Sequence, residues 1–334
     1  MSLLKRYPNN PVLHEDNIPW DCMSVFNAGI CKQGDRYLML FRTDSGPRER
    51  PVDQRTKIGV AQSDDGFNWK VAPDPIFDSE SMHELLVGQY TNHFPREEIV
   101  RIYDPRITII DGEIYLCAAL DTKHGIRGLI AKTSDLGRWD LLHITLPENR
   151  NMVLFPERVN GNFLRLDRPF PLYYTGGKES FDIWYSSSPD GRHWGEHRLL
   201  LAAEQVPFSN CKIGPGAPPI RTEKGWLAAF HAVIKNENKP LCGWSPEPWT
   251  KEYVAGLMLL DLEKPYKVIG MSQTPLLTSE ESYETEGFRG SVIFPGGMIA
   301  EEEGSVKMYY GAADTVVALA TGTVDELLSA ITPF

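Results

Sequence analysis

The sequence predicts an all-β protein in which residues 1–334 form a single domain, a five-bladed β-propeller. Three observations lead to this prediction: a hairpin pattern that recurs five times, a Ser/Asp/Gly/Trp turn that follows the first three hairpins, and the scarcity of long helical patterns. Five repeats of roughly 67 residues each suffice for four-stranded antiparallel blades with one long loop. Radial repetition protects the edges of such sheets.

Each hairpin joins an apolar segment to a strand with alternating apolar residues through a polar turn that contains Gly. Alternation with a period of two is that of a β-strand, and Gly supplies the positive φ that a tight hairpin requires. In chain order, we expect these hairpins at residues 26–42, 104–120, 155–166, 218–232 and 294–314.

A second repeated element places a Ser, an Asp/Gly turn and a Trp after a strand. Its copies are SDDGFNW (63–69), SDLGRW (134–139) and SPDGRHW (188–194). We expect Asp and Gly to form the turn and Trp to pack between sheets, without a ligand role. In the last two repeats, residues 254–270 and 316–328 run from an apolar strand into a short acidic connection and are expected to take the same place. The best helix candidate, residues 323–331, is short, which argues against an α/β fold.

Composition limits the class of protein and of partner. A hydrophobic fraction of 42% indicates a globular chain, and a formal net charge of −11 disfavours nucleic acid and anionic membranes as partners. The N-terminal residues lack the apolar run of a signal peptide, and no stretch is long enough to span a membrane. A cytoplasmic location is the expectation.

Metal and hydrolase motifs are not found. The five cysteines are an odd number with no metal-binding spacing, so we expect reduced thiols at Cys22, Cys31, Cys117, Cys211 and Cys242. The eight histidines include no H-x-x-x-H or H-E-x-x-H pair, and no G-x-S-x-G element is present. We expect no metal site and no Ser-His-Asp hydrolase.

One acidic residue and four basic ones are candidates for chemistry at the channel. Asp104, in Tyr-Asp-Pro-Arg, opens an inner strand; the alternative is a turn-forming Asp that caps a loop amide. The corresponding places in other blades carry basic side chains, namely Arg150, Arg168, Lys212 and His231. If these are not scattered surface residues, they form a pocket for a small dianion such as phosphate.

A single acid and a phosphate pocket together suggest one type of reaction. Glycoside hydrolysis usually needs two carboxylates, whereas inorganic phosphate that attacks the anomeric carbon needs no protein base. The Gly-rich run after Lys212 lacks P-loop spacing, so nucleotide binding is not supported.

The chain resembles glycoside hydrolase family 130, the β-mannoside phosphorylases and related β-mannosidases, which are five-bladed propellers. The resemblance spans nearly the whole chain and rests on blocks such as FNAG (26–29), YDPRI (103–107), RNMVLFPERVNG (150–161), LDRP (166–169), KIGPGAPPI (212–220) and YYGAADTVVALA (309–320).

The resemblance implies a role for each of these residues. Asp104 is the catalytic acid; Arg150, Arg168, Lys212 and His231 bind phosphate; and Asn27, Arg42, Tyr103 and Asp314 bind substrate, with Tyr253 as a weaker candidate. No cofactor is expected beyond inorganic phosphate as co-substrate. The implied reaction is inverting phosphorolysis of a β-1,4- or β-1,2-linked mannoside to α-mannose 1-phosphate and a shortened sugar.

Departures from the family pattern concern the acceptor sugar. They lie in residues 170–191, in HAV (231–233) and in GFRGSVIFPGG (287–297). One alternative is an inverting β-mannosidase, which would need a second channel carboxylate, with Glu204, Glu284 and Glu286 as candidates; another is a non-catalytic carbohydrate-binding propeller. The sequence leaves open whether a neighbouring subunit of a homo-oligomer closes the acceptor side.

Overall fold

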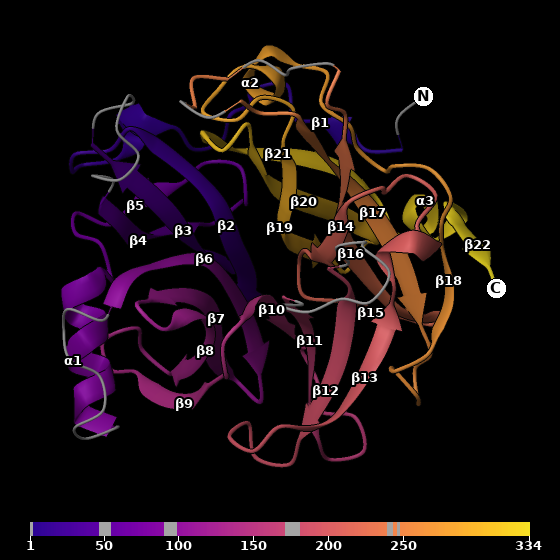
Figure 1. The fold of residues 1–334 in the computed structure, drawn as a ribbon, viewed down its shortest axis with the longest axis horizontal. Coiled ribbons are helices and arrows are strands. Elements are labelled where there is room, and N and C mark those ends of the chain that lie inside the picture. The colour runs from indigo at the N-terminus through magenta and orange to yellow at the C-terminus, as the bar shows by residue number, and fades with distance from the viewer. Residues whose placement is uncertain (1–2, 47–54, 90–98, 171–180, 239–242, 246–247) are drawn as a thin grey trace.

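The computed structural model describes residues 3–46, 55–89, 99–170, 181–238, 243–245 and 248–334. Five antiparallel sheets follow one another around a central axis in chain order, and the first lies beside the last (Figure 1). The predicted five-bladed β-propeller is confirmed.

The first three blades have the same order of four strands, from the inner strand at the channel to the outer one. Blade 1 consists of β2 (Ser24–Gln33), β3 (Arg36–Ser45), β4 (Arg55–Ser63) and β5 (Lys70–Val71). Blade 2 consists of β6 (Ile99–Ile110), β7 (Glu113–Thr122), β8 (Gly125–Thr133) and β9 (Asp140–Ile144). Blade 3 consists of β10 (Asn149–Leu154), β11 (Phe163–Pro169), β12 (Ile183–Ser188) and β13 (Gly195–Leu201).

Each of the last two blades includes a strand from one end of the chain. Blade 4 consists of β14 (Lys212–Pro215), β15 (Ile220–Thr222), β16 (Gly225–Lys235), β17 (Lys251–Leu260), β18 (Val268–Ser272) and the C-terminal β22 (Ile331–Pro333). Blade 5 consists of β19 (Ile293–Ala300), β20 (Ser305–Ala312), β21 (Val316–Thr323) and the N-terminal β1 (Lys5–Arg6). The N-terminal strand therefore completes the last blade.

Four of the five predicted hairpins contain the expected pair of strands, and the third was placed too far along the chain. Its inner strand is β10, which ends at Leu154, whereas residues 155–162 form the connection to β11. Asn160 and Gly161 both have positive φ, of 53° and 80°, and Pro156 lacks an amide donor. These residues favour a turn over a strand.

The Trp-containing turns lie between the third and fourth strands of blades 1 to 3, as predicted. Trp69 packs edge-on against Tyr309 of blade 5, and Trp139 packs against Phe77 of blade 1. The equivalent segment of blade 5 runs from β21 into helix α3 (Val324–Ser329), which lies within the helix predicted at residues 323–331.

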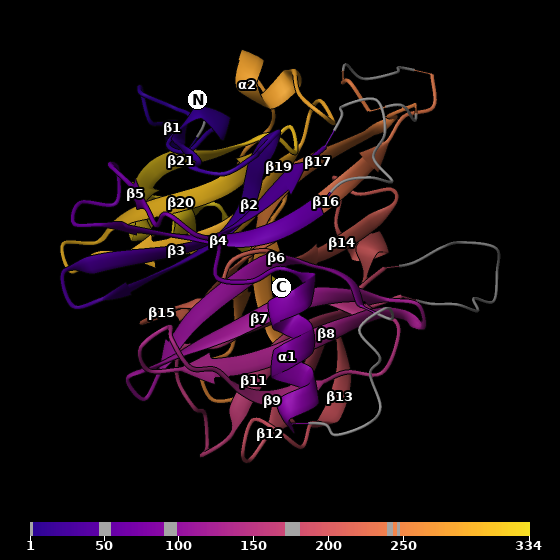
Figure 2. The same ribbon diagram turned by 90° about the vertical axis from the view of Figure 1, so that its left-hand side faces the viewer.

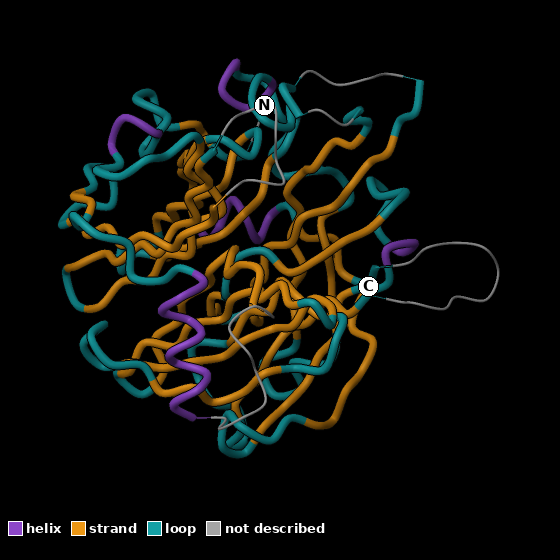
Figure 3. Tube along the Cα trace, turned by 60° about the vertical axis from the view of Figure 1, so that its left-hand side comes forward, coloured by secondary structure: helices purple, strands orange, loops and turns teal. Residues whose placement is uncertain are grey.

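Helices are few and lie outside the ring (Figure 3). The longest, α1 (Ser79–Gln89), was not predicted from the sequence; it lies beside blade 2 (Figure 2) and buries Met82 and Leu86. Asp78 caps it by accepting hydrogen bonds from the backbone amides of Glu80 and Ser81 at 3.0 and 2.9 Å. The remaining short helices are η1 (Glu15–Asn17), η4 (Ala203–Gln205) and α2 (Ser282–Thr285).

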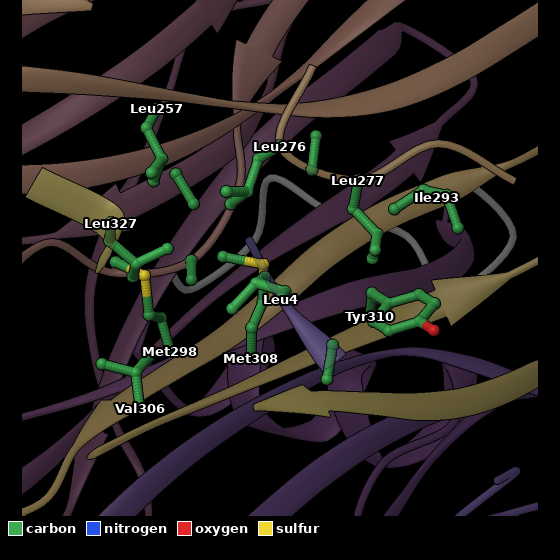
Figure 4. Close-up of a cluster of buried hydrophobic side chains, with 14 of the residues drawn as sticks. Leu4, Leu257, Leu276, Leu277, Ile293, Met298, Val306, Met308, Tyr310 and Leu327 are labelled. Carbon is green, nitrogen blue, oxygen red and sulfur yellow. The ribbon is translucent and has the colours of Figure 1, made fainter. Parts of the chain in front are cut away.

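Hydrophobic cores fill the spaces between adjacent blades. Figure 4 shows the core between blades 4 and 5, where Leu257 of β17 meets Met298 of β19 and Met308 of β20. Leu4 and Leu327 bring both termini into this core, so ring closure is stabilised by apolar burial as well as by strand pairing. Among the helices of the described part of the chain, none is long and apolar enough to cross a membrane.

Candidate active site

The inner strands of blades 1, 2 and 3 share one irregularity at the channel. Their pairing with the second strand shifts register between Phe26 and Gly29, between Tyr103 and Arg106, and between Arg150 and Val153. The first residue inside each shift is left-handed: Asn27, Asp104 and Asn151 have φ of 50°, 53° and 59°. A bulge re-aims side chains near active sites, and these three all line the same pocket.

Arg106 links four of the five blades near the axis. Its buried guanidinium donates to the backbone oxygens of Gly216 at 2.7 Å, Pro105 at 2.8 Å and Pro295 at 3.2 Å. These acceptors belong to blades 4, 2 and 5, and a longer bond of 3.4 Å reaches the backbone oxygen of Asn27 in blade 1. Burial lowers the pKa of Arg106 to about 10, so the side chain stays charged at neutral pH.

The pocket at this end of the channel has a volume of about 400 Å³. Seven of the nine predicted site residues line it: Asn27, Arg42, Tyr103, Asp104, Arg150, Arg168 and Asp314. The other two lie behind its wall. The Lys212 ammonium is 5.3 Å from the centre of the Tyr253 ring, and His231 contacts Arg168. The structure therefore brings the predicted residues into one region.

Asp104 is held through one of its two carboxylate oxygens. Its Oδ1 accepts a hydrogen bond from Asn27 Nδ2 at 2.9 Å and from Arg42 Nη1 at 3.2 Å. Burial opposes ionisation, but the charge of Arg42 and the bond from Asn27 outweigh it, and the pKa of Asp104 lies below its usual value. Without a ligand, this carboxylate is ionised at neutral pH.

The second carboxylate in the pocket has the opposite shift. Burial raises the pKa of Asp314, with a smaller contribution from the negative charge of Asp104, although Arg289 lies 3.4 Å from its Oδ2. The positive charge of Arg42 acts on both carboxylates. Its guanidinium is held by Asp44, whose Oδ2 accepts a hydrogen bond from Arg42 Nη2 at 2.6 Å. The pocket thus contains two carboxyl groups with different affinities for a proton.

Arg150, Arg168 and Lys212 lie close together at one side of the pocket, and no carboxylate of the described residues forms an ion pair with any of them. Arg150 Nη1 donates to the Tyr103 hydroxyl at 3.2 Å, and the Nε atoms of Arg150 and Arg168 are buried without a partner in the part of the chain that the structure describes. Burial and the charge of Arg150 lower the pKa of Arg168 to about 9. Burial, Arg168 and Arg150 lower the pKa of Lys212 to about 6. Crowded cations with open donors form a site for an anion.

His231 completes this group as a neutral ring. Its Nε2 lies 2.9 Å from Arg168 Nη1, and an arginine can only donate, so Nε2 accepts and the proton resides on Nδ1. Burial and the charges of Arg168 and Lys212 hold the pKa of His231 well below its usual value. The imidazole packs on Phe294, with ring centres 4.6 Å apart, and orients Arg168.

Eight residues that line the pocket were not predicted as site residues: Phe26, Arg101, Asn151, Trp249, Phe288, Arg289, Val292 and Phe294. Asn151 had a detectable signal, since it occupies the bulge position of Asn27 and Asp104 in the next repeat. Arg289 and Phe288 lie in the segment that departs from the family pattern. Trp249 stacks against Tyr253, with ring centres 5.8 Å apart, and no motif indicated it.

The three candidates for an additional catalytic carboxylate lie elsewhere. Glu204 is exposed in η4, Glu286 lines a separate surface pocket, and Glu284 is fully buried in an ion pair with Arg6. Residues 171–180, part of the departure at 170–191, and Cys242 lie outside the described residues. The other four cysteines are free thiols. No cluster of potential metal ligands occurs among the residues that the structure describes.

Comparisons with known proteins identify the family of the chain. A family model described as beta-1,4-mannooligosaccharide phosphorylase matches residues 3–332. The 1,2-beta-oligomannan phosphorylase of a Thermoanaerobacter species is 31% identical over 96% of this chain and 97% of its own. The beta-1,4-mannooligosaccharide phosphorylase of Ruminococcus albus is 30% identical over 97% and 89%.

Solved structures give the same result for the fold. The beta-1,2-mannobiose phosphorylase from Listeria innocua, in complex with beta-1,2-mannobiose, superposes with a TM-score of 0.79, covers 98% of both chains and is 25% identical. The chain belongs to glycoside hydrolase family 130.

Proposed function

We propose that the protein is an inverting β-mannoside phosphorylase. Phosphate attacks the anomeric carbon of a β-1,4- or β-1,2-linked mannoside, the bond from that carbon to the bridging oxygen breaks, and the products are α-mannose 1-phosphate and a shortened sugar. Relatives of both linkage types carry phosphorylase names, which supports the reaction class. The reverse reaction transfers mannose from the sugar phosphate, which makes the enzyme a glycosyltransferase in that direction.

The observation that carries this proposal is the group of cations beside Asp104. Arg150 and Arg168 keep buried donors without a partner among the described residues, and burial next to these two charges lowers the pKa of Lys212 to about 6. A dianion removes that cost, since it supplies the missing acceptors and the opposite charge. Phosphate bound there lies next to the candidate acid.

Asp104 is assigned the role of the acid and the neighbouring side chains that of a mannose subsite. The proton passes to the leaving oxygen, by way of a mannose hydroxyl if the family pattern holds. In the free protein Arg42 and other cations keep the pKa of Asp104 low. Phosphate offsets this positive field and raises the pKa of Asp104, so the acid becomes protonated in the complex and not before. Asn27, Arg42, Tyr103 and Asp314 then contact the sugar.

The hydrolase alternative is less well supported. An inverting mannosidase needs a second carboxylate to activate water. Glu204, Glu284 and Glu286 do not line the pocket, and Asp314, which does, lies 3.4 Å from Arg289 and is assigned to the mannose subsite. A binding protein without activity would have no use for buried, uncompensated cations next to a carboxylate.

The finer expectations from the sequence are part of the same proposal. We infer one catalytic domain over residues 1–334, a cytoplasmic location, a β-mannoside oligosaccharide and phosphate as partners, and no organic or metal cofactor. Light scattering would measure whether the protein assembles into a homo-oligomer.

The test is release of α-mannose 1-phosphate from β-1,4-mannobiose, β-1,2-mannobiose and β-mannosyl-glucose, with and without inorganic phosphate. We expect turnover that depends on phosphate, and the productive substrate identifies the linkage. Free mannose produced equally well without phosphate would establish a hydrolase instead.

A further inference from the structure

The face of blade 3 that packs on blade 2 is polar where the same face of the earlier blades is apolar. Positions with the same register relative to the bulge are, from blade 1 to blade 3, Met39 and Phe41, then Leu116 and Ala118, then Arg165 and Asp167. In the first two blades these side chains belong to hydrophobic cores. In blade 3 the two residues at these positions form an ion pair on the face toward blade 2.

The ion pair belongs to a buried network. Arg165 Nε lies 2.9 Å from Asp167 Oδ1. The same oxygen accepts a hydrogen bond from Asn149 Nδ2 at 2.9 Å, and Asp167 Oδ2 accepts one from the Ser186 hydroxyl at 2.7 Å. Arg165 and Asp167 are 2% and 3% exposed. Two atoms have no partner among the described residues, the donor Arg165 Nη1 and the acceptor Asn149 Oδ1. Native structures rarely leave such groups buried and unsatisfied without a reason.

A cavity opens at this network. It has a volume of about 430 Å³ and is lined by Arg165, Asp167 and Asn149 together with the half-buried indoles of Trp184 and Trp194 and the exposed Leu146. Trp194 supports the Arg165 guanidinium, which lies 4.2 Å from its ring centre. Trp184 takes the register position that Leu129 fills in blade 2. The cavity therefore combines large aromatic surfaces with a donor and an acceptor, as small-molecule sites do.

We propose that this cavity is a second carbohydrate site, which binds one pyranose ring of a neutral oligosaccharide. A sugar hydroxyl both donates and accepts, so adjacent hydroxyls can satisfy Arg165 Nη1 and Asn149 Oδ1 together. The apolar faces of the indoles suit the C–H face of the ring. The identification of the oligosaccharide as a β-mannoside rests on the proposed function. The inference that a pyranose binds here does not depend on it.

Charge distinguishes this cavity from the phosphate pocket. The guanidinium of Arg165 is compensated by Asp167, and burial together with Arg165 lowers the pKa of His143, a further lining residue, to about 4, so that its ring is neutral at pH 7. An anion gains little here. A second phosphate site is therefore disfavoured, and a neutral ligand is favoured.

The two sites lie on opposite faces of one hairpin. Arg150 pairs with Arg168 across β10 and β11, and the adjacent pair is Asn149 with Pro169. Successive residues of a strand point to opposite faces. The phosphate arginines thus face the channel pocket while Asn149 and Pro169 line the cavity between blades, so a sugar bound there does not occupy the catalytic pocket.

The experiment uses the full chain labelled with 5-fluorotryptophan, in an Asp104→Asn background that prevents turnover. Fluorine NMR resolves the eight tryptophans; Trp184→Leu and Trp249→Phe assign the signals of the two sites. β-1,4-Mannobiose, β-1,2-mannobiose and cellobiose are titrated to about 10 mM, the range of a weak single-sugar site. Trp184→Leu introduces the residue that blade 2 carries at this position, and Phe334→Ala, which truncates an exposed C-terminal side chain outside both pockets, is the control.

We expect the Trp184 signal to shift and saturate with its own affinity, both in the parent and in Trp249→Phe, and to respond to sugar in the same way in Phe334→Ala. Trp184→Leu with Asp104 intact should keep kcat/KM on mannobiose within about twofold. A Trp184 signal that no sugar moves, or a loss of kcat/KM beyond roughly tenfold in Trp184→Leu, would overturn the proposal and leave the network as a support for the phosphate arginines. A response at Trp184 without any mannoside turnover would refute the proposed function alone.

Discussion

Two buried carboxylates in this protein have opposite surroundings. Glu284 is fully buried in α2. Its carboxylate accepts hydrogen bonds from Arg6 Nε at 2.8 Å, Arg6 Nη2 at 2.9 Å and the Tyr310 hydroxyl at 2.7 Å, and from the backbone amides of Glu280 and Glu281 at 2.7 and 3.0 Å. Asp104 accepts two bonds, both on one oxygen, and its other cationic neighbours form no bond to it.

The difference in hydrogen bonding indicates that Glu284 is a structural group, whereas Asp104 is available for chemistry. Every bond to Glu284 is made within the protein, so the Glu284 cluster closes the ring by joining the N-terminal strand to blade 5. The site around Asp104 keeps donors and acceptors open at Arg150, Arg168 and Asn27. Buried polar groups are normally satisfied, and a concentration of open ones indicates where a ligand completes the network.

The largest effect is expected at Asp104. Asp104→Asn removes the acid proton with little change in volume and should lower phosphorolysis by about 10²- to 10⁴-fold. The melting temperature should stay close to that of the parent, since few bonds are lost. Initial rates on the productive mannobiose, with calorimetry in parallel, measure both quantities. Activity near that of the parent would remove Asp104 from the mechanism.

Glu284→Gln should have the reverse outcome. Breaking a buried ion pair costs about 3–5 kcal/mol, so the free energy of unfolding should fall by that order while kcat on the folded protein is retained. The pKa of Glu284 is held below 4.5 by Arg6 and its other donors, against the effect of burial. The contribution of ionised Glu284 to the free energy of unfolding is therefore present above pH 4.5 and is lost on acidification. Urea titrations at pH 7 and pH 4 should show the variant and the parent converging at the lower pH.

Arg150→Ala tests the open donors directly. Loss of a charge-assisted bond should raise the phosphate KM by roughly 10- to 100-fold, about 1.5–3 kcal/mol, with a smaller effect on the mannoside KM. Arg158→Ala removes a surface arginine that pairs with Asp111 and is the matched control. An equal increase of both KM values would indicate that Arg150 positions the whole pocket and does not bind phosphate.

Lys212 should give the smallest change and the most specific one. Its pKa of about 6 means that the free protein holds it uncharged at pH 8, so phosphate binding there should take up a proton. Calorimetric titrations in buffers of different ionisation enthalpy measure this uptake. In Lys212→Met the uptake should decrease and the phosphate-free protein should gain roughly 1 kcal/mol of stability. Lys132→Met, a surface variant paired with Glu113, should change neither quantity.

The sequence predicted the blades better than their connections. Alternation and the Asp/Gly/Trp turns are local signals. Alternation located the first two strands of blades 1 and 2, and the turns marked the ends of the third strands of blades 1 to 3. Helix α1 was missed although Asp78 begins it with a capping side chain, because its apolar residues are few. The third hairpin was misplaced because the run from Phe155 has apolar residues but contains Pro156 and ends in the Asn160–Gly161 turn.

The sequence by itself determined the repeat and the number of blades, since these depend on local periodicity, and its resemblance to a family indicated the candidate acid and its cationic partners. The tertiary structure decided which groups are satisfied. Glu284 and Asp104 look alike in a sequence, and only the folded chain brings Arg6 across 278 positions to one of them and leaves the other beside open donors. The physical reason is that burial and hydrogen bonding depend on neighbours from distant blades, which no local pattern specifies.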